Sequence, residues 1–166
     1  YICLVNSKII LLLLALNPLI GQDRSIIFST GAPSGIEGHS IHWDGYTGQS
    51  VSDRFSIASD MVLEAIKVYA SNVSNSANAI IILQADNNNS PGEEIYSWQV
   101  DVALETHGNN YFLINTTDLC IYLVENNYYW ITLHANDSES EIIWYYSNNA
   151  TFPFSISIDL GSNWAE

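Results

Sequence analysis

Basic side chains are scarce in this sequence, which has 4 Lys and Arg residues against 18 Asp and Glu residues and a formal net charge of −14. A protein that follows a phosphate backbone needs clusters of Lys and Arg, so this balance excludes nucleic-acid binding. Charged residues make up only 13% of the chain and hydrophobic residues 48%. These fractions exclude a disordered chain and a coiled coil, because both depend on many charged side chains.

Long apolar runs are also missing. The longest, Ile9 to Leu16, follows Lys8 and ends at Asn17-Pro18, whereas a membrane-spanning helix needs about 20 apolar residues. A short apolar run behind a lysine, followed by a small residue such as Gly21, is typical of a secretory signal peptide. We therefore expect residues 1–21 to be an apolar signal-peptide helix, with a buried core helix as the alternative. The mature chain is then secreted or on the cell surface, without a stable membrane span.

Cysteine is nearly absent, with 2 residues in the chain. Cys3 would leave with the signal peptide, so the mature protein would have no internal disulfide. Cys120 lies in an apolar segment and is expected to be a small buried side chain with a free thiol.

Residues 22–166 are enough for a single domain, since about 150 residues make one. The sequence stops after Trp164-Ala165-Glu166 without a terminal turn. We expect the domain to continue beyond this point.

Aromatic and β-branched residues are plentiful and occur in short segments separated by Asn, Ser and Gly. This pattern favours an all-β domain. Met61 to Ala70 fits a helical stripe as well as a strand, and we predict a strand because its neighbours are strands. The other expected strands are Ser25 to Ser29, Ser40 to Trp43, Gln49 to Ile57, Ala79 to Ala85, Ile95 to Leu104, Tyr111 to Ile114, Leu119 to Val124, Tyr128 to Ala135, Glu141 to Ser147 and Phe154 to Leu160. About nine to ten strands predict an antiparallel β-sandwich of jelly-roll type.

Two turns have clear signals. Asp86 to Gly92 contains Asn and Pro-Gly and is the strongest turn signal in the chain. Glu125 to Asn127 predicts a tight turn in which Asn accepts a positive φ angle.

Four segments in order resemble a family of exported bacterial β-sandwich modules, the choice-of-anchor domains. They are Gln49 to Phe55, Ile66 to Tyr69, Ala85 to Gly92 and Tyr128 to Leu133, within a stretch from Gln49 to Asn149. The Pro-Gly turn together with the Tyr-Trp strand is the most specific part. The chain departs from the family at Asn126-Asn127, where relatives often have Gly. The resemblance implies an exported sandwich and brings no catalytic residues.

No cofactor is expected. His39 and His42 are three residues apart on a strand and face opposite sides, so with Asp44 they do not predict a metal site. Asp86, Asn88 and Ser90 have the alternating oxygen ligands of a calcium loop, although Pro91 stands where such a loop needs Gly. A hairpin turn explains these three residues, and calcium is kept as an alternative.

Two further histidines, His107 and His134, stand alone in the sequence and are predicted to be surface or hydrogen-bonded side chains.

The chain is not expected to be an enzyme. It has no Ser-His-Asp pattern, nucleophile elbow or phosphate loop. Its carboxylate groups, at Glu93-Glu94 and from Asp137 to Glu141, lie along single loops, which does not define the cleft of a glycosidase. A small secreted hydrolase is the weakest alternative.

We therefore predict a non-catalytic extracellular module with a display, adhesion or spacer role. The alternative is a carbohydrate-binding module, because exposed aromatic rings stack on the apolar faces of sugars. The candidate stacking residues are Trp43, Trp98, Trp144 and Tyr146, with filling of the core as the competing explanation. The expected partner is an extracellular glycan or a cell-surface component.

Overall fold

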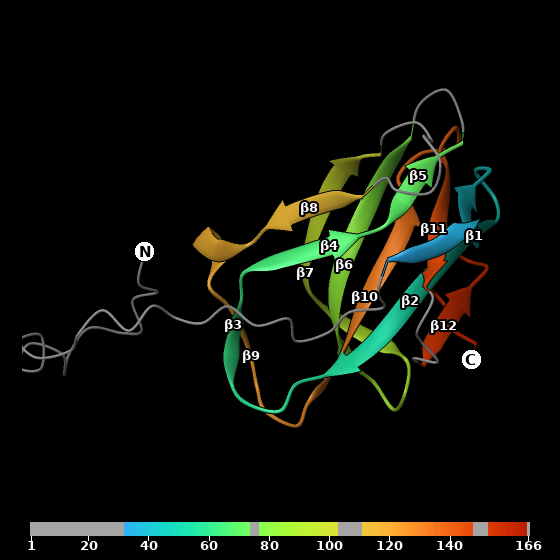
Figure 1. Ribbon diagram of the computed structural model, residues 1–166. Helices are drawn as coiled ribbons and strands as arrows, with labels where there is room; N and C mark the ends of the chain where they lie inside the picture. The colour runs from blue at the N-terminus through green and yellow to red at the C-terminus, as the bar shows by residue number, and fades with distance from the viewer. Residues whose placement is uncertain (1–31, 74–76, 103–110, 148–152, 166) are drawn as a thin grey trace, which may run out of the picture.

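The computed structural model describes residues 32–73, 77–102, 111–147 and 153–165 (Figure 1). The expected signal peptide, the expected strand Ser25 to Ser29 and His107 lie outside these residues. Within them, no helix is long and apolar enough to cross a membrane.

The described residues form an all-β, antiparallel fold, as the sequence predicts. One curled sheet has the strand order β5–β11–β1–β2–β10–β6–β7, and β12 also pairs with β2. Its strands are β1 (Pro33–Trp43), β2 (Gly48–Ser56), β5 (Ala70–Asn72), β6 (Asn78–Asp86), β7 (Pro91–Asp101), β10 (Tyr128–Ala135), β11 (Glu141–Ser147) and β12 (Phe154–Ser157). The described part of the chain has twelve strands in all, more than the nine to ten expected, because the predicted segment Met61 to Ala70 is divided among three strands.

A second, smaller layer consists of two short pairs, β3 (Met61–Leu63) with β9 (Ile121–Leu123) and β4 (Ala65–Val68) with β8 (Phe112–Asn115). In this ribbon, the β4–β8 pair crosses in front of β6 and β7 in Figure 1. The segment Met61 to Ala70 is therefore a strand, interrupted at Glu64 and Tyr69. Its helix-like spacing of apolar residues has no structural counterpart, because pairing with β8 and β9 decides the conformation.

The hydrophobic core lies between these two layers. Ile81, Leu83 and Leu133 of the large sheet are completely buried and belong to one cluster with Ile66 and Ile114 of the ribbon. Burial of such side chains contributes about 1.5–3 kcal/mol each.

Strand alternation gives the large sheet two different faces around β2 and β10. Val51 and Phe55 lie on the core face, where Phe55 is opposite Tyr129. Ser52 is opposite Thr132 on the other face, called the outer face below. This outer face is polar, and yet both of these side chains are completely buried.

Both predicted turns form. Asn126 has a φ angle of 62°, and in the turn between β6 and β7 Asn88 and Asn89 have φ angles of 53° and 68°. Asn tolerates this left-handed conformation better than other non-glycine residues.

The expectation for Cys120 is wrong. It is exposed and has a φ angle of 51° at the end of the short 3₁₀ turn Thr117–Leu119. The apolar residues beside Cys120 wrongly suggest that it is buried, because only Ile121 and Leu123 of that segment point into the core.

Candidate functional site

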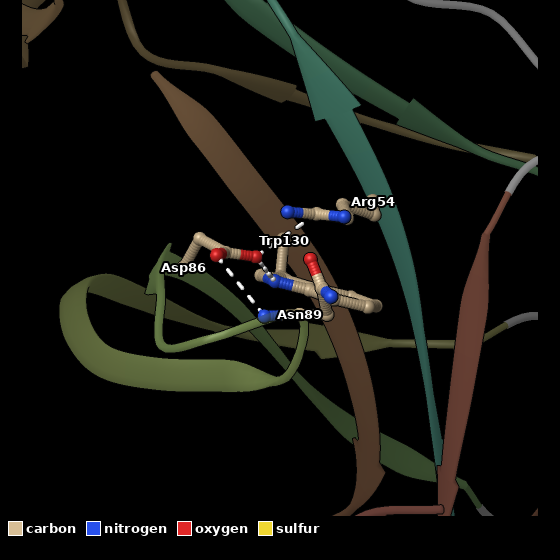
Figure 2. Close-up of polar contacts among 4 residues, drawn as sticks. All are labelled: Arg54, Asp86, Asn89 and Trp130. Atoms are coloured by element: carbon tan, nitrogen blue, oxygen red, sulfur yellow. Dashed lines mark hydrogen bonds and ion pairs between the residues drawn. The ribbon is translucent and has the colours of Figure 1, made fainter. Parts of the chain in front are cut away.

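The turn between β6 and β7 folds back over the outer face and forms a polar cluster with β2 and β10 (Figure 2). Asp86 Oδ1 accepts a hydrogen bond of 2.8 Å from the indole Nε1 of Trp130 and forms an ion pair of 2.9 Å with Arg54 Nε. Its other oxygen, Oδ2, accepts a hydrogen bond of 3.2 Å from the backbone N of Asn89. Trp130 is completely buried, and the Arg54 and Asp86 side chains are 14% and 19% exposed. The cluster therefore fastens the turn to the sheet.

Both basic residues of the described part of the chain also lie over aromatic rings. The Arg54 guanidinium is 3.9 Å from the ring centroid of Tyr128 and 5.7 Å from that of Trp130. The Lys67 ammonium is 3.9 Å from the ring of Tyr111 and 4.6 Å from that of Tyr69. Such cation–π contacts contribute about 0.5–2 kcal/mol each, so these cations stabilise the fold.

The structure places the calcium candidates in the predicted hairpin turn. Asp86 directs its carboxylate toward Arg54 and Trp130, and Ser90 exchanges backbone hydrogen bonds with Asn87. Asn88 lies at the exposed tip and donates to Asn87 Oδ1 over 3.4 Å. Among the described residues, no three His, Cys, Asp or Glu side chains gather as ligands for a metal.

Other aspartates also close loops. Asp44 accepts hydrogen bonds from the backbone N of Thr47 (2.7 Å) and of Tyr46 (2.8 Å), which hold its pKa below the usual value. Asp159 accepts from the side chain and backbone N of Asn163 (2.6 and 2.8 Å), which lowers its pKa to about 2. Hydrogen bonds to a carboxylate stabilise its charged form, so these loops are best formed at neutral pH.

Asp60 and Asp137 act in the same way. Asp60 accepts from the backbone N of Glu125 and from the Tyr122 hydroxyl, both at 2.7 Å. Asp137 accepts from the Ser140 hydroxyl at 2.8 Å. These contacts lower the pKa of both carboxyl groups.

A serine and a histidine meet on the outer face, which the sequence pattern does not reveal because they are distant in the chain. Ser50 Oγ is hydrogen-bonded to Nδ1 of His134. Ser50 is completely buried, and burial lowers the pKa of His134 to about 4. No described carboxylate is hydrogen-bonded to His134, so the orienting third group of a catalytic triad does not come from these residues.

The segment after β12 covers this Ser–His pair. Gly48 N donates to Ile158 O over 3.3 Å, and the Trp164 ring lies 6.5 Å from that of His134, centroid to centroid. Gly161, with a φ angle of 85°, sits against His134 so closely that an added Cβ would lie 3.1 Å from the imidazole. The pair therefore lies beneath the segment that follows β12, and His134 is a hydrogen-bonded side chain.

The four candidate stacking residues lie on three strands. Trp144 and Tyr146 follow each other on one face of β11, with Trp144 8% and Tyr146 45% exposed. Trp43 and Trp98 are partly buried and pack against the core. Four strands of the sheet separate Trp98 on β7 from β11, so Trp98 does not share a surface with the other rings.

A further group of side chains lies at the edge where β12 pairs with β2. Asp53 is opposite Phe154, and its neighbour on the other side is Ile131 of β10. The His39 ring of β1 lies 5.2 Å from the Phe154 ring and 4.8 Å from the Tyr146 ring, measured between centroids. Burial raises the pKa of Asp53 to about 7 and lowers that of His39.

The sequence contains a signal for this group that the prediction did not use. Asp53 occupies a core-facing position of β2, between Val51 and Phe55, where the alternating pattern predicts a hydrophobic residue. A carboxyl group at a core-facing position is an exception to this pattern, and such exceptions suggest a function.

No protein-family model matches this chain, and no curated protein and no solved structure is significantly similar to it.

Proposed function

We propose that this chain is a non-catalytic β-sandwich module that is exported and works outside the cell, in display, adhesion or spacing. The observation that carries the proposal is the use of polar side chains in the loops. Five aspartates accept hydrogen bonds that close turns or attach them to the sheets: Asp44, Asp60, Asp86, Asp137 and Asp159. A framework of this kind suits a module that must keep its shape, and the strongly acidic composition favours solubility.

The proposal is tested by producing the full chain in a bacterium and determining the N-terminus of the product by mass spectrometry. Cleavage after Gly21 and recovery of the product outside the cytoplasm are expected. Retention in the cytoplasm with residues 1–21 attached would contradict the export part of the proposal.

The non-catalytic part needs a separate measurement. The purified protein is assayed against a panel of ester and glycoside substrates beside the Ser50→Ala and His134→Gln variants. No turnover above the buffer rate is expected. Turnover that both substitutions abolish would instead make the Ser50–His134 pair a reaction centre.

Carbohydrate binding is the second candidate, and it rests on the exposed ring of Tyr146. An exposed tyrosine offers an apolar face to a sugar together with a hydroxyl group. Binding on a glycan array that Tyr146→Ala removes and Tyr146→Phe preserves would favour this candidate over a spacer. Equal signals for the protein and for Tyr146→Ala would eliminate Tyr146 as its binding residue.

A further inference from the structure

The edge group consists of Asp53, His39, Phe154 and Tyr146, and it occupies the place where β1 and β12 separate. Both strands pair with the same side of β2: β1 through Trp43 opposite Gly48, and β12 through Phe154 opposite Asp53. The His39 ring then spans from Phe154 of β12 to Tyr146 of β11. Phe154 and Tyr146 are 40% and 45% exposed, so two aromatic rings are open to solvent at this edge.

Asp53 lies opposite Phe154 and has no hydrogen-bonding or ionic partner among the described residues. It is partly buried. Arg54 N donates to Pro153 O over 3.0 Å, so Asp53 and Phe154 form the adjacent non-hydrogen-bonded pair, in which the two side chains approach most closely. Arg54 itself projects to the outer face and is paired with Asp86.

A buried carboxyl group without a partner destabilises the fold when it ionises. A bound cation would remove that penalty. A metal ion needs several oxygen ligands, and the described residues offer no group of three acidic or histidine side chains. An organic ammonium ion needs only one carboxylate and aromatic faces around it. The net charge of −14 attracts cations over longer distances as well.

We propose that this edge of the sandwich binds an organic ammonium group, with Asp53 as its counter-ion and the rings of Phe154 and Tyr146 against its alkyl groups. Two sources share this chemistry: the side chain of lysine in a peptide, and the quaternary ammonium of a choline head group. Either binds in the purified protein, whether or not the module is exported, so failure of the export experiment leaves this proposal standing.

The test is a titration of the purified chain with choline and with Nα-acetyl-lysine methylamide, followed by NMR or calorimetry at pH 8 and low salt. Saturable binding of at least one of them is expected. The ligand that binds more tightly identifies the source. Asp53→Asn should weaken binding at least tenfold and Phe154→Leu several-fold. Asp101→Asn, which removes the same charge from an exposed position on β7, should change nothing.

Binding should also depend on pH. Asp53, with a pKa of about 7, is mostly neutral at pH 5.5, so affinity should fall roughly thirtyfold from pH 8 to pH 5.5. His39 of β1 is the other ionisable group at this edge; burial lowers its pKa, and its protonation would act in the same direction. Tyr129 of β10 and Tyr146 of β11 lie on the same core face. Asp53→Asn should remove most of the pH dependence.

Three results would overturn the proposal: no saturation with either ligand, equal affinity for the Asp53→Asn variant, or complete displacement by millimolar CaCl₂. If Asp53→Asn fails to fold, as judged by circular dichroism, the Phe154→Leu variant and the pH dependence of the unmodified chain decide the question.

Discussion

Two aspartates on opposite faces of the same sheet have contrasting surroundings. Asp86 at the outer face has Arg54, the Trp130 indole and the Asn89 backbone as partners, whereas Asp53 on the core face has none among the described residues. Both carboxyl groups are largely withdrawn from water. The difference shows that burial alone does not decide whether a charge stabilises a fold, because the partners decide it. On this basis the carboxylate at the outer face stabilises the fold, whereas the core edge is where we propose that an ammonium group binds.

The largest expected effect is on the outer face. Trp130→Ala removes a completely buried ring together with the hydrogen bond to Asp86, and should lower the free energy of unfolding by about 3–5 kcal/mol. Urea denaturation measures the change. Trp130→Phe keeps most of the packing and should cost about half as much. Equal losses for both variants would show that the indole hydrogen bond, rather than the ring, dominates.

Removal of the charge of Asp86 should have the next largest effect. Asp86→Asn leaves Arg54 without its ion pair in a mostly buried position, and such losses cost about 3 kcal/mol. The matched control is Asp101→Asn on exposed β7, which should stay within about 0.5 kcal/mol of the unmodified protein. A neutral Asp86→Asn would mean that the aromatic rings alone hold Arg54.

The substitution of Asp by Asn on the core face, at Asp53, should raise the free energy of unfolding instead of lowering it. The pKa of Asp53 is raised to about 7 in the folded state, so its contribution to stability is lost as the pH rises from about 4 to 7. Asp53→Asn should therefore stabilise the protein by about 2–3 kcal/mol at pH 8. At pH 4 the gain should be close to zero. Denaturation curves at the two pH values test this, and an equal effect at both would contradict an ionising Asp53.

The lowered pKa of His134 predicts that the folded protein becomes less stable at acidic pH. Burial lowers its pKa to about 4 in the folded state, so its contribution is present above about pH 6.5 and is lost as the pH falls from 6.5 to 4. The loss should be about 2 kcal/mol, and His134→Gln should flatten it. NMR titration of the imidazole measures the pKa directly, and a value near 6.5 would contradict a buried position.

The smallest effect compares two neighbouring serines of the outer face. Ser52 is opposite Ser155 across β2 and β12, and both are completely buried. Ser52 Oγ donates to Ile131 O over 3.2 Å and lies 2.8 Å from Thr132 Oγ1, while Ser155 Oγ has no partner among the described residues. Ser52→Ala should cost about 1 kcal/mol and Ser155→Ala nothing. Thermal melts would detect this difference.

Much of the fold could be predicted from local patterns. The bounds of β10 and β11 agree with the prediction to the residue, and those of β2 and β6 to within one, because alternation and flanking turn residues are local signals. Local signals left Met61 to Ala70 ambiguous, because its pairing with β8 and β9 depends on residues about fifty positions away.

The polar clusters were not predictable in this way. Arg54, Asp86 and Trp130 come from three strands, as do Asp53, Phe154 and His39. The order of the strands in the sheet brings each set together, and a single sequence does not specify that order. Cys120 was misjudged because its apolar neighbours do not reveal that the chain turns outward there.

The scarcity of basic residues has a consequence for digestion by proteases. Arg54 and Lys67 are the only trypsin sites in the described part of the chain, and both lie within paired strands, β2 and β4, with their charged groups over aromatic rings. A protease needs several residues in an extended, unpaired conformation, so trypsin reaches these two sites only when a strand leaves its sheet. Each cleavage inside the sandwich therefore records an unfolding event, and the folded module resists enzymes that cut after Lys or Arg.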